Sequence, residues 1–312
     1  NPTSGTWTHR LISGASALSS DNGTGGISTV GTYVYLSDLE TSVGDPYGLV
    51  RLNVTNGNIT RFGTKSFGNR LFASSWPGSD ILELDPATGA IIQTIPTPAS
   101  GGGDAGLAFD GKYIWFIVSG SDTLYKIDAD LGTVVDTFSV GTSTNSGFDG
   151  LAYMNGYVYL LDPFLTDEIV VFDPVLRTTV NRLKVGALNG LDISGGLTPN
   201  PTRNSLYVTA TFSDTIYEVS AVDGRLLFNA GSPRQFASGE YWDAGLATVG
   251  DKLYVGTQSG ANTPIRIFNF DGVFQGTIPW PNFFGVYALG GDGIQGLVKT
   301  TYRYRPWTCY EA

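Results

Sequence analysis

The sequence has very few of the side chains that supply most enzyme chemistry. It contains one histidine, His9, and one cysteine, Cys309, among 312 residues. The sequence therefore does not support a Ser-His-Asp triad, a histidine-rich metal site or a histidine general base. The single cysteine excludes an intrachain disulfide and leaves thiol catalysis and cysteine-ligated zinc without support. No P-loop pattern occurs, so nucleotide binding is not expected.

Helix-forming residues and long apolar runs are also scarce. There are 6 Lys, 6 Glu and 1 Met, against 22 Asp and 42 Gly, which favour tight turns. Little helix is therefore expected. No apolar run approaches the roughly 18 residues that a membrane span requires, so none is predicted.

Positive charge is sparse and scattered. The net charge is −10, the pI is near 4.5, and the 18 Lys and Arg do not cluster. Nucleic acid is therefore not an expected partner, because phosphate binding needs clustered basic residues. Sequons at Asn22, Asn53 and Asn58 would be glycosylation sites in a eukaryotic secretory pathway. We expect an extracellular or secreted protein, or one at the cell surface.

What the chain does have is a repeat. The strand-like triplet "IWF" at Ile114 has equivalents 37 to 48 residues apart, namely "VYL" at Val34, "LFA" at Leu71, "VYL" at Val158, "LYV" at Leu206 and "LYV" at Leu253. A second strand follows each triplet, as in "ILELD", "LYKID" and "IYEVS". Four residues after its last residue stands Gly57, Gly89, Gly132 or Gly224, while Arg177 and Gly272 are exceptions. An Asn or Asp followed by a glycine of positive φ is typical of a hairpin turn.

A short inner strand such as "GLAFDGKY" precedes each triplet, so each unit predicts four antiparallel strands in about 44 residues, the pattern of a β-propeller blade. We expect an all-β, seven-bladed β-propeller of four-stranded blades, forming a single domain over residues 1–312. Residues 285–305 supply the C-terminal strands of a composite last blade. Residues 6–13 close it as an N-terminal strand, which hides two exposed edges. Six blades is the alternative.

Two of the repeats resemble a known group. The stretches "YIWFIVSGSDTLYKIDADLGTVVDTF" and "SLYVTATFSDTIYEVSAVDGRLL" resemble the repeats of YVTN and NHL β-propellers. The resemblance covers most of residues 25–280. It implies the propeller fold and little about function, because those groups include ligand-binding modules, scaffolds and a few enzymes.

One repeat position is expected to converge at the mouth of the central channel. Residues just before the inner strands occupy it, namely Asp104, Asp149, Asn189 and Asp243, with Arg61 and Lys65 expected opposite them. Asp104, Asp149 and Asp243 could hold Ca²⁺, which prefers carboxylate and amide oxygens. Each Asp could equally cap the backbone of an incoming loop, and a catalytic carboxylate pair is the third alternative. Asp residues also recur between the second and third strands. Their repetition at a turn position favours a role in stabilising the turns over a wider ring of metal ligands.

Large aromatic side chains are expected on the same face. Trp76, Tyr241 and Trp242 are the ones we expect to be exposed, and the loop over residues 229–243 is the longest that leads into an inner strand. Aromatics beside carboxylates are typical of a sugar or peptide site. Packing between blades is the alternative role for most aromatics of this face.

Three functions remain open. The first is a secreted or cell-surface module that binds a glycan, a peptide or a partner protein at the channel mouth. The second is a structural subunit of an extracellular layer or filament. The third is a Ca²⁺-dependent hydrolase or lyase using Asp104, Asp149 and Asp243. Ca²⁺ is the only cofactor considered, and no catalytic residue is assigned.

Overall fold

The structure is a computed structural model that divides the chain into two compact units, Asn1–Phe67 and Gly68–Ala312. The units are described separately below, and the single domain over residues 1–312 stays a prediction. Within the backbone ranges that follow, side chains are described from residue 69 onward, except at 105 and 243. The described backbone covers residues 24–30, 33–38, 48–53, 59–63, 69–75, 80–98, 105–118, 121–141, 147–163, 166–210, 213–240, 243–258, 263–281 and 285–291.

The first unit holds one four-stranded antiparallel sheet. Its strands are β1 (Thr24–Val30), β2 (Tyr33–Asp38), β3 (Gly48–Asn53) and β4 (Ile59–Gly63), hydrogen-bonded in chain order. This is the strand order predicted for one repeat.

The second unit contains five four-stranded antiparallel blades, which we call A to E. Blade A has the order β26 (Val286–Gly291), β5 (Leu71–Ser75), β6 (Asp80–Leu84) and β7 (Ile91–Pro96). Blade B is β8 (Ala105–Phe109), β9 (Tyr113–Val118), β10 (Thr123–Asp128) and β11 (Thr133–Ser139). Blade C is β12 (Leu151–Met154), β13 (Tyr157–Asp162), β14 (Glu168–Asp173) and β15 (Thr178–Leu183). Blade D is β16 (Ile193–Asn200), β17 (Ser205–Ala210), β18 (Thr215–Ser220) and β21 (Gln235–Ala237), and blade E is β22 (Asp243–Val249), β23 (Lys252–Thr257), β24 (Ile265–Asn269) and β25 (Phe274–Ile278).

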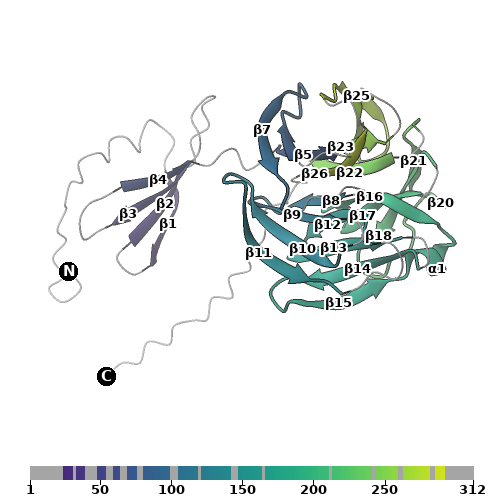
Figure 1. Cartoon of the computed structure of the whole chain (residues 1–312), viewed down its shortest axis with the longest axis horizontal. Coiled ribbons are helices and arrows are strands. Elements are labelled where there is room, and N and C mark those ends of the chain that lie inside the picture. The colour runs from purple at the N-terminus through teal and green to yellow at the C-terminus, as the bar shows by residue number, and fades with distance from the viewer. Residues whose placement is uncertain are drawn as a thin grey trace. The chain divides into compact units, whose positions relative to one another are not determined.

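The inner strands of these blades close a ring. In turn, β8 contacts β12, β12 contacts β16, β16 contacts β22, β22 contacts β26, and β26 contacts β8. Figure 1 shows the blades arranged around this ring. The described residues of the second unit therefore form an all-β propeller ring of five blades, and the prediction of seven blades is not confirmed.

The difference in blade number arises at the C-terminal strand. β26 pairs with β5, with Leu289 opposite Ala73 and Gly291 opposite Leu71. It is thus the inner strand of the blade that holds residues 71–96, whereas the sequence assigned it to a separate composite blade. The predicted partner strand at residues 6–13, and residues 292–305, lie outside the described residues. The chain segment from β5 to β7 provides only three strands of blade A and has no inner strand. The strand β26 takes that place beside β5 and so closes the ring.

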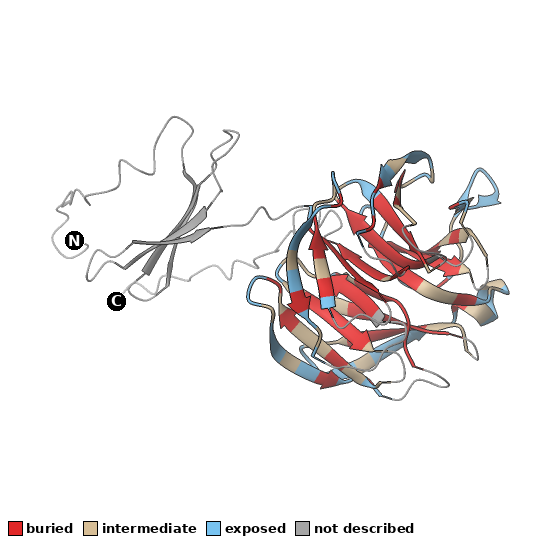
Figure 2. Ribbon diagram, turned by 45° about the horizontal axis from the view of Figure 1, so that its top comes forward, coloured by how far each residue is buried: buried red, intermediate tan, exposed pale blue. Residues whose placement is uncertain are grey.

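Burial follows position within the blade. The second strand of blade A is buried at all five residues, whereas its outer strand β7 is mostly exposed, and Figure 2 shows the same gradient in the other blades. Buried side chains of neighbouring blades meet in shared clusters, such as the one joining Leu161 of blade C to Val208 of blade D. The core therefore lies between blades, and the alternation along each strand places it there.

The glycine repeated at the start of the inner strands of blades B and C has a steric role. A Cβ on Gly106 would lie 2.4 Å from the carbonyl oxygen of Asp149, and one on Gly150 would lie 2.5 Å from that of Gly195. Adjacent inner strands thus approach too closely for a side chain at this position.

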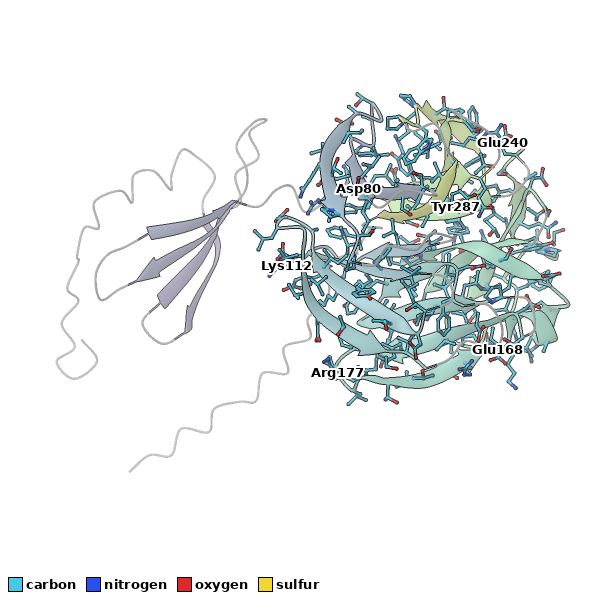
Figure 3. The ribbon with its side chains drawn as sticks, viewed as in Figure 1. Asp80, Lys112, Glu168, Arg177, Glu240 and Tyr287 are labelled. Carbon is cyan, nitrogen blue, oxygen red and sulfur yellow. The ribbon has the colours of Figure 1, made fainter. Side chains whose placement is uncertain are left out.

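The turns after the third strands of blades A, B and D match the prediction, and the turn of blade C has the same backbone although Arg177 replaces the glycine. Gly89, Gly132 and Gly224 have φ of 74°, 66° and 75°, and Arg177 takes φ 55° at the same position of blade C. Arg177 lies at the outer rim, where it donates two hydrogen bonds to Asp136 (Figure 3). The scarcity of helix is confirmed as well, since the described helix is the single turn α1 (Val185–Asn189).

Candidate functional site

Asp149 lies directly before the inner strand of blade C, as predicted. Its carboxylate is buried, and its Oδ2 accepts a hydrogen bond from the backbone N–H of Gly195 in blade D at 3.4 Å. Its own N–H donates to the carbonyl of Leu161. The contact links blade C to the inner strand of blade D, and the role of Asp149 at the channel mouth stays a prediction.

Asn189 is the last residue of α1, and its side chain contacts backbone groups. Its Nδ2 donates to the carbonyls of Val185 and Gly224, each at 2.8 Å, and its Oδ1 accepts from the N–H of Leu226 at 2.9 Å. The amide thereby ties blade C to the turn that leads into the outer strand of blade D.

The other predicted residues are only partly described. Asp243 begins β22, where it pairs with Thr257, and Arg61 lies in β4 opposite Val50 in the first unit. The side chains of both lie outside the described residues, as do Asp104, Lys65, Trp76, Tyr241 and Trp242. Among described residues, no three His, Cys, Asp or Glu side chains lie together as a metal-binding group. The channel-mouth site and its Ca²⁺ stay predictions.

Blade D departs from the common pattern in its outer strand. After β18 the chain makes a two-stranded hairpin, β19 (Phe228–Asn229) and β20 (Ser232–Pro233), before β21 begins. The N–H of Arg234 donates to the carbonyl of Leu227 at 2.7 Å and closes the base of the hairpin. In blades A, B, C and E a short turn occupies this place. Sequence reasoning treated residues 229–243 as one loop and missed this hairpin.

The tip of this hairpin has an unusual backbone. Its two central residues, Ala230 and Gly231, have φ of 50° and 86°. Positive φ at both positions matches a type I′ turn, which joins two-residue hairpins tightly. Alanine is strained in this left-handed region, whereas glycine is not.

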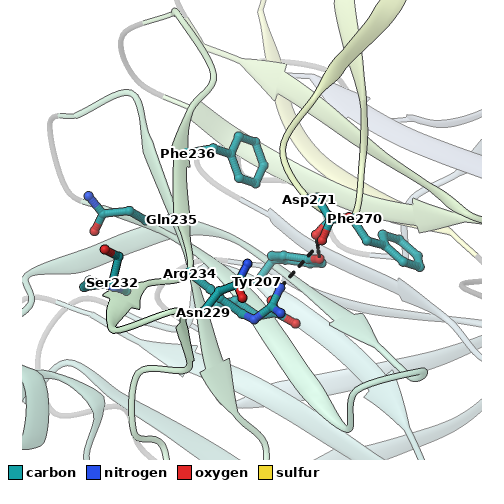
Figure 4. A pocket seen from close by; sticks show the side chains of 10 residues that line it. Tyr207, Asn229, Ser232, Arg234, Gln235, Phe236, Phe270 and Asp271 are labelled. Atoms are coloured by element: carbon teal, nitrogen blue, oxygen red, sulfur yellow. Dashed lines mark hydrogen bonds and ion pairs between the residues drawn. The ribbon is translucent and has the colours of Figure 1, made fainter.

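A pocket of about 210 Å³ lies beside the hairpin, between blades D and E. Its lining is shown in Figure 4 and comprises Tyr207, Glu218, Asn229, Ser232, Pro233, Arg234, Gln235, Phe236, Phe270 and Asp271. Eight of these residues, from Tyr207 to Phe236, belong to blade D. The other two, Phe270 and Asp271, lie in the turn after β24 of blade E. The pocket thus lies at the boundary between two blades, and one of its walls is the β19–β20 hairpin, which among the five blades only blade D has.

Glu218 is the buried charge of this pocket. Its side chain is 2% exposed, and it accepts hydrogen bonds from Asn200, Ser205 and Arg203. Arg203 also donates to Asp271 at 2.6 Å. A buried carboxylate is tolerated when it is paired and hydrogen-bonded in this way.

Tyr207 stands opposite Glu218 on the neighbouring strand. Its hydroxyl donates to the carbonyl of Phe270 at 2.8 Å and accepts from Asn200. Burial, followed by the nearby negative charge of Glu218, raises the pKa of Tyr207 well above its usual value. The phenol is therefore neutral at physiological pH and links blade D to blade E.

The same arrangement recurs between blades A and B. Arg70 donates to both carboxylate oxygens of Glu83 at 2.8 Å, contacts Asp130 at 3.1 Å and reaches the carbonyl of Ala129. In each case an Arg and a Glu of one blade hold the turn of the next blade through an Asp and a backbone carbonyl. We call these two networks the Arg–Glu–Asp clasps. The sequence signal was the Glu shared by "ILELD" and "IYEVS" at one repeat position, which the sequence analysis did not use.

No protein-family model matches the chain, and no curated protein matches it. Among solved structures it is similar to a nidogen/laminin complex, with 14% identity, a TM-score of 0.44 and coverage of 83% of this chain and 80% of that chain. It is also similar to glutaminyl cyclase from Myxococcus xanthus, with 17% identity, a TM-score of 0.38 and coverage of 57% and 81%. A third is the structure of RRP9 WD40 repeats, with 14% identity, a TM-score of 0.38 and coverage of 68% and 58%.

The expected propeller resemblance is confirmed at the level of the fold by the blades themselves. Within the described part of the chain, no helix has both the length and the apolar character needed to cross a bilayer.

Proposed function

We propose that this protein is an extracellular binding module that recognises its partner at the pocket between blades D and E. The observation that carries the proposal is the hairpin of β19 and β20. The five blades of the ring share the same four-stranded pattern. Blade D adds the β19–β20 hairpin to this pattern, and the hairpin forms one wall of the pocket. Additions to a rigid scaffold are where binding residues concentrate.

The chemistry of the lining supports binding. It combines one arginine and two carboxylates with half-buried Phe236 and Phe270 and exposed amide and hydroxyl groups on the hairpin. Apolar area with a few placed polar groups is typical of a recognition pocket. The extracellular location belongs to the proposal and is supported by the three sequons of the first unit.

The hairpin offers a clean test. Because Arg234 already donates to the carbonyl of Leu227, replacing residues 228–233 by Asn-Gly leaves a two-residue turn closed by the same hydrogen bond. We expect peptides and glycans that bind the intact protein on arrays to lose binding in this shortened variant, at an unchanged melting temperature. As a matched control, Val175→Ser with Leu176→Ser alters the corresponding exposed turn of blade C. Ligands that bind the shortened variant as well as the intact protein would contradict the proposal.

A structural subunit is the second candidate, because apolar side chains recur on the outer surface. Ile91 and Ile92 of blade A, Val134 and Val135 of blade B, and Phe274 of blade E are each more than 40% exposed. They lie on outer strands, whose free edges could pair with another copy. Sedimentation at rising concentration separates the two functions, since a structural subunit should assemble under physiological salt and a binding module should stay monomeric.

The channel mouth remains a further place for a ligand. The test is to compare ligand binding by the intact protein, on glycan arrays and in pull-downs, with binding by Trp76→Ala and Trp242→Ala. A Ca²⁺-dependent hydrolase or lyase predicts a rise in melting temperature with Ca²⁺ that EDTA reverses, and an absent shift together with metal-free protein by elemental analysis would contradict it.

A further inference from the structure

We propose that the pocket between blades D and E holds a single carboxylate, presented by an acidic side chain of an extended segment of a partner protein, and that Arg234 is the residue that receives it. The proposal rests on the binding function proposed above and names its ligand.

Arg234 is the least satisfied charged group of the pocket. Its side chain is 24% exposed, and its closest carboxylate oxygens are Oδ1 of Asp271 at 3.6 Å and Oε2 of Glu218 at 3.8 Å. Both distances are too long for a hydrogen bond. Over the residues that the structure describes, no hydrogen bond from its guanidinium group is formed, although the group carries five donors. At 24% exposure these donors reach water, and a ligand carboxylate would give them a charged acceptor in its place.

Glu218, the buried carboxylate of the pocket, is in the opposite condition, because it accepts hydrogen bonds from three side chains. Asp271 is 65% exposed and accepts a hydrogen bond from Arg203. A cationic ligand would have to compete with Arg203 for both carboxylates. Arg234, by contrast, keeps unused donors, which favours an anionic group.

The charge of the whole chain restricts that anion further. With a net charge of −10, the protein repels polyanions such as nucleic acids or highly sulfated glycans. A ligand that is neutral apart from one carboxylate meets little of this repulsion. It can still accept two parallel hydrogen bonds from the planar guanidinium group of Arg234.

The surroundings favour a peptide as the carrier of the carboxylate. β21 is the outermost strand of blade D, and among described strands none pairs with its outer edge. An extended segment can add to such an edge through main-chain hydrogen bonds. Ser232 and Gln235 present exposed polar groups beside Arg234, and Phe236 offers apolar contact (Figure 4).

The test uses an array of extended, end-capped peptides, each carrying one Glu or Asp and each paired with its Gln or Asn twin. Oligosaccharides of a uronic acid form a separate arm. We expect the intact protein to bind acidic peptides and to bind their amide twins about 10- to 100-fold more weakly, the range for a hydrogen bond to a charged group. Arg234→Gln should remove this preference. Arg234→Lys should restore little of it, because lysine lacks the planar fork that matches a carboxylate.

Arg225→Gln is the matched control. Arg225 is in the same blade, its side chain is 65% exposed, and its ion-pair partner is Asp223, so the substitution removes one positive charge without touching the pocket lining. Melting temperatures of all variants establish that they are folded. Acidic peptides that bind Arg234→Gln and Arg234→Lys as tightly as the intact protein would overturn the proposal.

Equal binding of acidic peptides and their twins would also overturn it, and so would binding of uronate oligosaccharides in place of peptides. These outcomes differ from failure of the proposed function. A ligand that needs the hairpin and is indifferent to Arg234 would leave the binding site in place and remove only the carboxylate assignment.

Discussion

The Arg–Glu–Asp clasp between blades A and B permits a demanding test of what holds the blades together. The perturbation is Arg70→Met, which keeps most of the apolar stem and removes the charge. Arg70 and Glu83 have side chains that are 10% and 4% exposed. The guanidinium group also lies 5.0 Å from the ring centre of Phe72 and 5.3 Å from that of Phe109. The substitution therefore removes the two hydrogen bonds and the positive charge that Arg70 gives to the buried carboxylate of Glu83.

The expected loss follows from that burial. Removing one partner of a buried ion pair costs about 3–5 kcal/mol, because the remaining charge stays desolvated. A typical domain has a free energy of unfolding of about 5–15 kcal/mol. The Arg70→Met variant should thus lose a large part of its stability, measured as the change in free energy of unfolding in urea followed by tryptophan fluorescence.

Two further variants make the result interpretable. Arg70→Met combined with Glu83→Leu removes both charges and should recover most of the loss, since apolar replacement of a buried pair is often near neutral. Arg177→Met breaks a pair of similar geometry with Asp136, but those side chains are 52% and 40% exposed, so it should cost about 1 kcal/mol or less. The reasoning fails if Arg70→Met costs no more than Arg177→Met.

Three other outcomes are expected. Ala230→Gly should raise the free energy of unfolding by about 1 kcal/mol, because it relieves the left-handed backbone at the hairpin tip; a destabilised variant would speak against strain there. Gly150→Ala should lower it by about 1–3 kcal/mol, because the added Cβ meets the carbonyl of Gly195, and urea unfolding at wild-type stability would show that the ring can expand. Burial raises the pKa of Tyr153 and Tyr254 to about 12. The unfolded chain releases these protons near pH 10, before the folded state does, so stability should fall from about pH 10 to pH 12. Because the chain has 16 tyrosines, the absorbance titration is compared with that of Tyr153→Phe and Tyr254→Phe, and loss of a transition near pH 10 in these variants would refute this.

The blade pattern was predictable because it is local. The triplet at Ile114 and the turn that ends at Gly132 lie within one short stretch of chain, and alternation and turn residues suffice to place both. Even Arg177 could be placed, since it stands at the repeat position where the other turns have glycine. Its positive φ shows that the repeat sets the backbone of this turn despite the side chain.

The number of blades was not predictable in the same way. It depends on the pairing of Val286–Gly291 with Leu71–Ser75, two segments about 200 residues apart. Both have the apolar pattern of a strand, and nothing in that pattern identifies the partner. Counting repeat lengths therefore assigned β26 to a blade of its own.

The candidate site was only partly accessible from the sequence. The repeat position of Asp149 was recognised, but its contact with the N–H of Gly195 depends on how blades C and D meet. The clasps were hidden because Arg70 and Arg203 stand at different distances from their aligned strands, one and three residues before them. The hairpin could have been found from Ala230-Gly231, since two central residues of this kind between short strand-forming segments indicate a tight turn.

Closure of the ring by β26 also determines when the protein can finish folding during synthesis. The strand Leu71–Ser75 is buried throughout in the finished ring, yet its inner neighbour is among the last described segments to be made. At about 5–20 residues per second, roughly 10–40 s pass between synthesis of the two strands. During that interval an apolar strand with an unpaired edge is exposed to the cell. A nascent chain paused before residue 286 should therefore bind chaperones through blade A and release them once β26 has emerged.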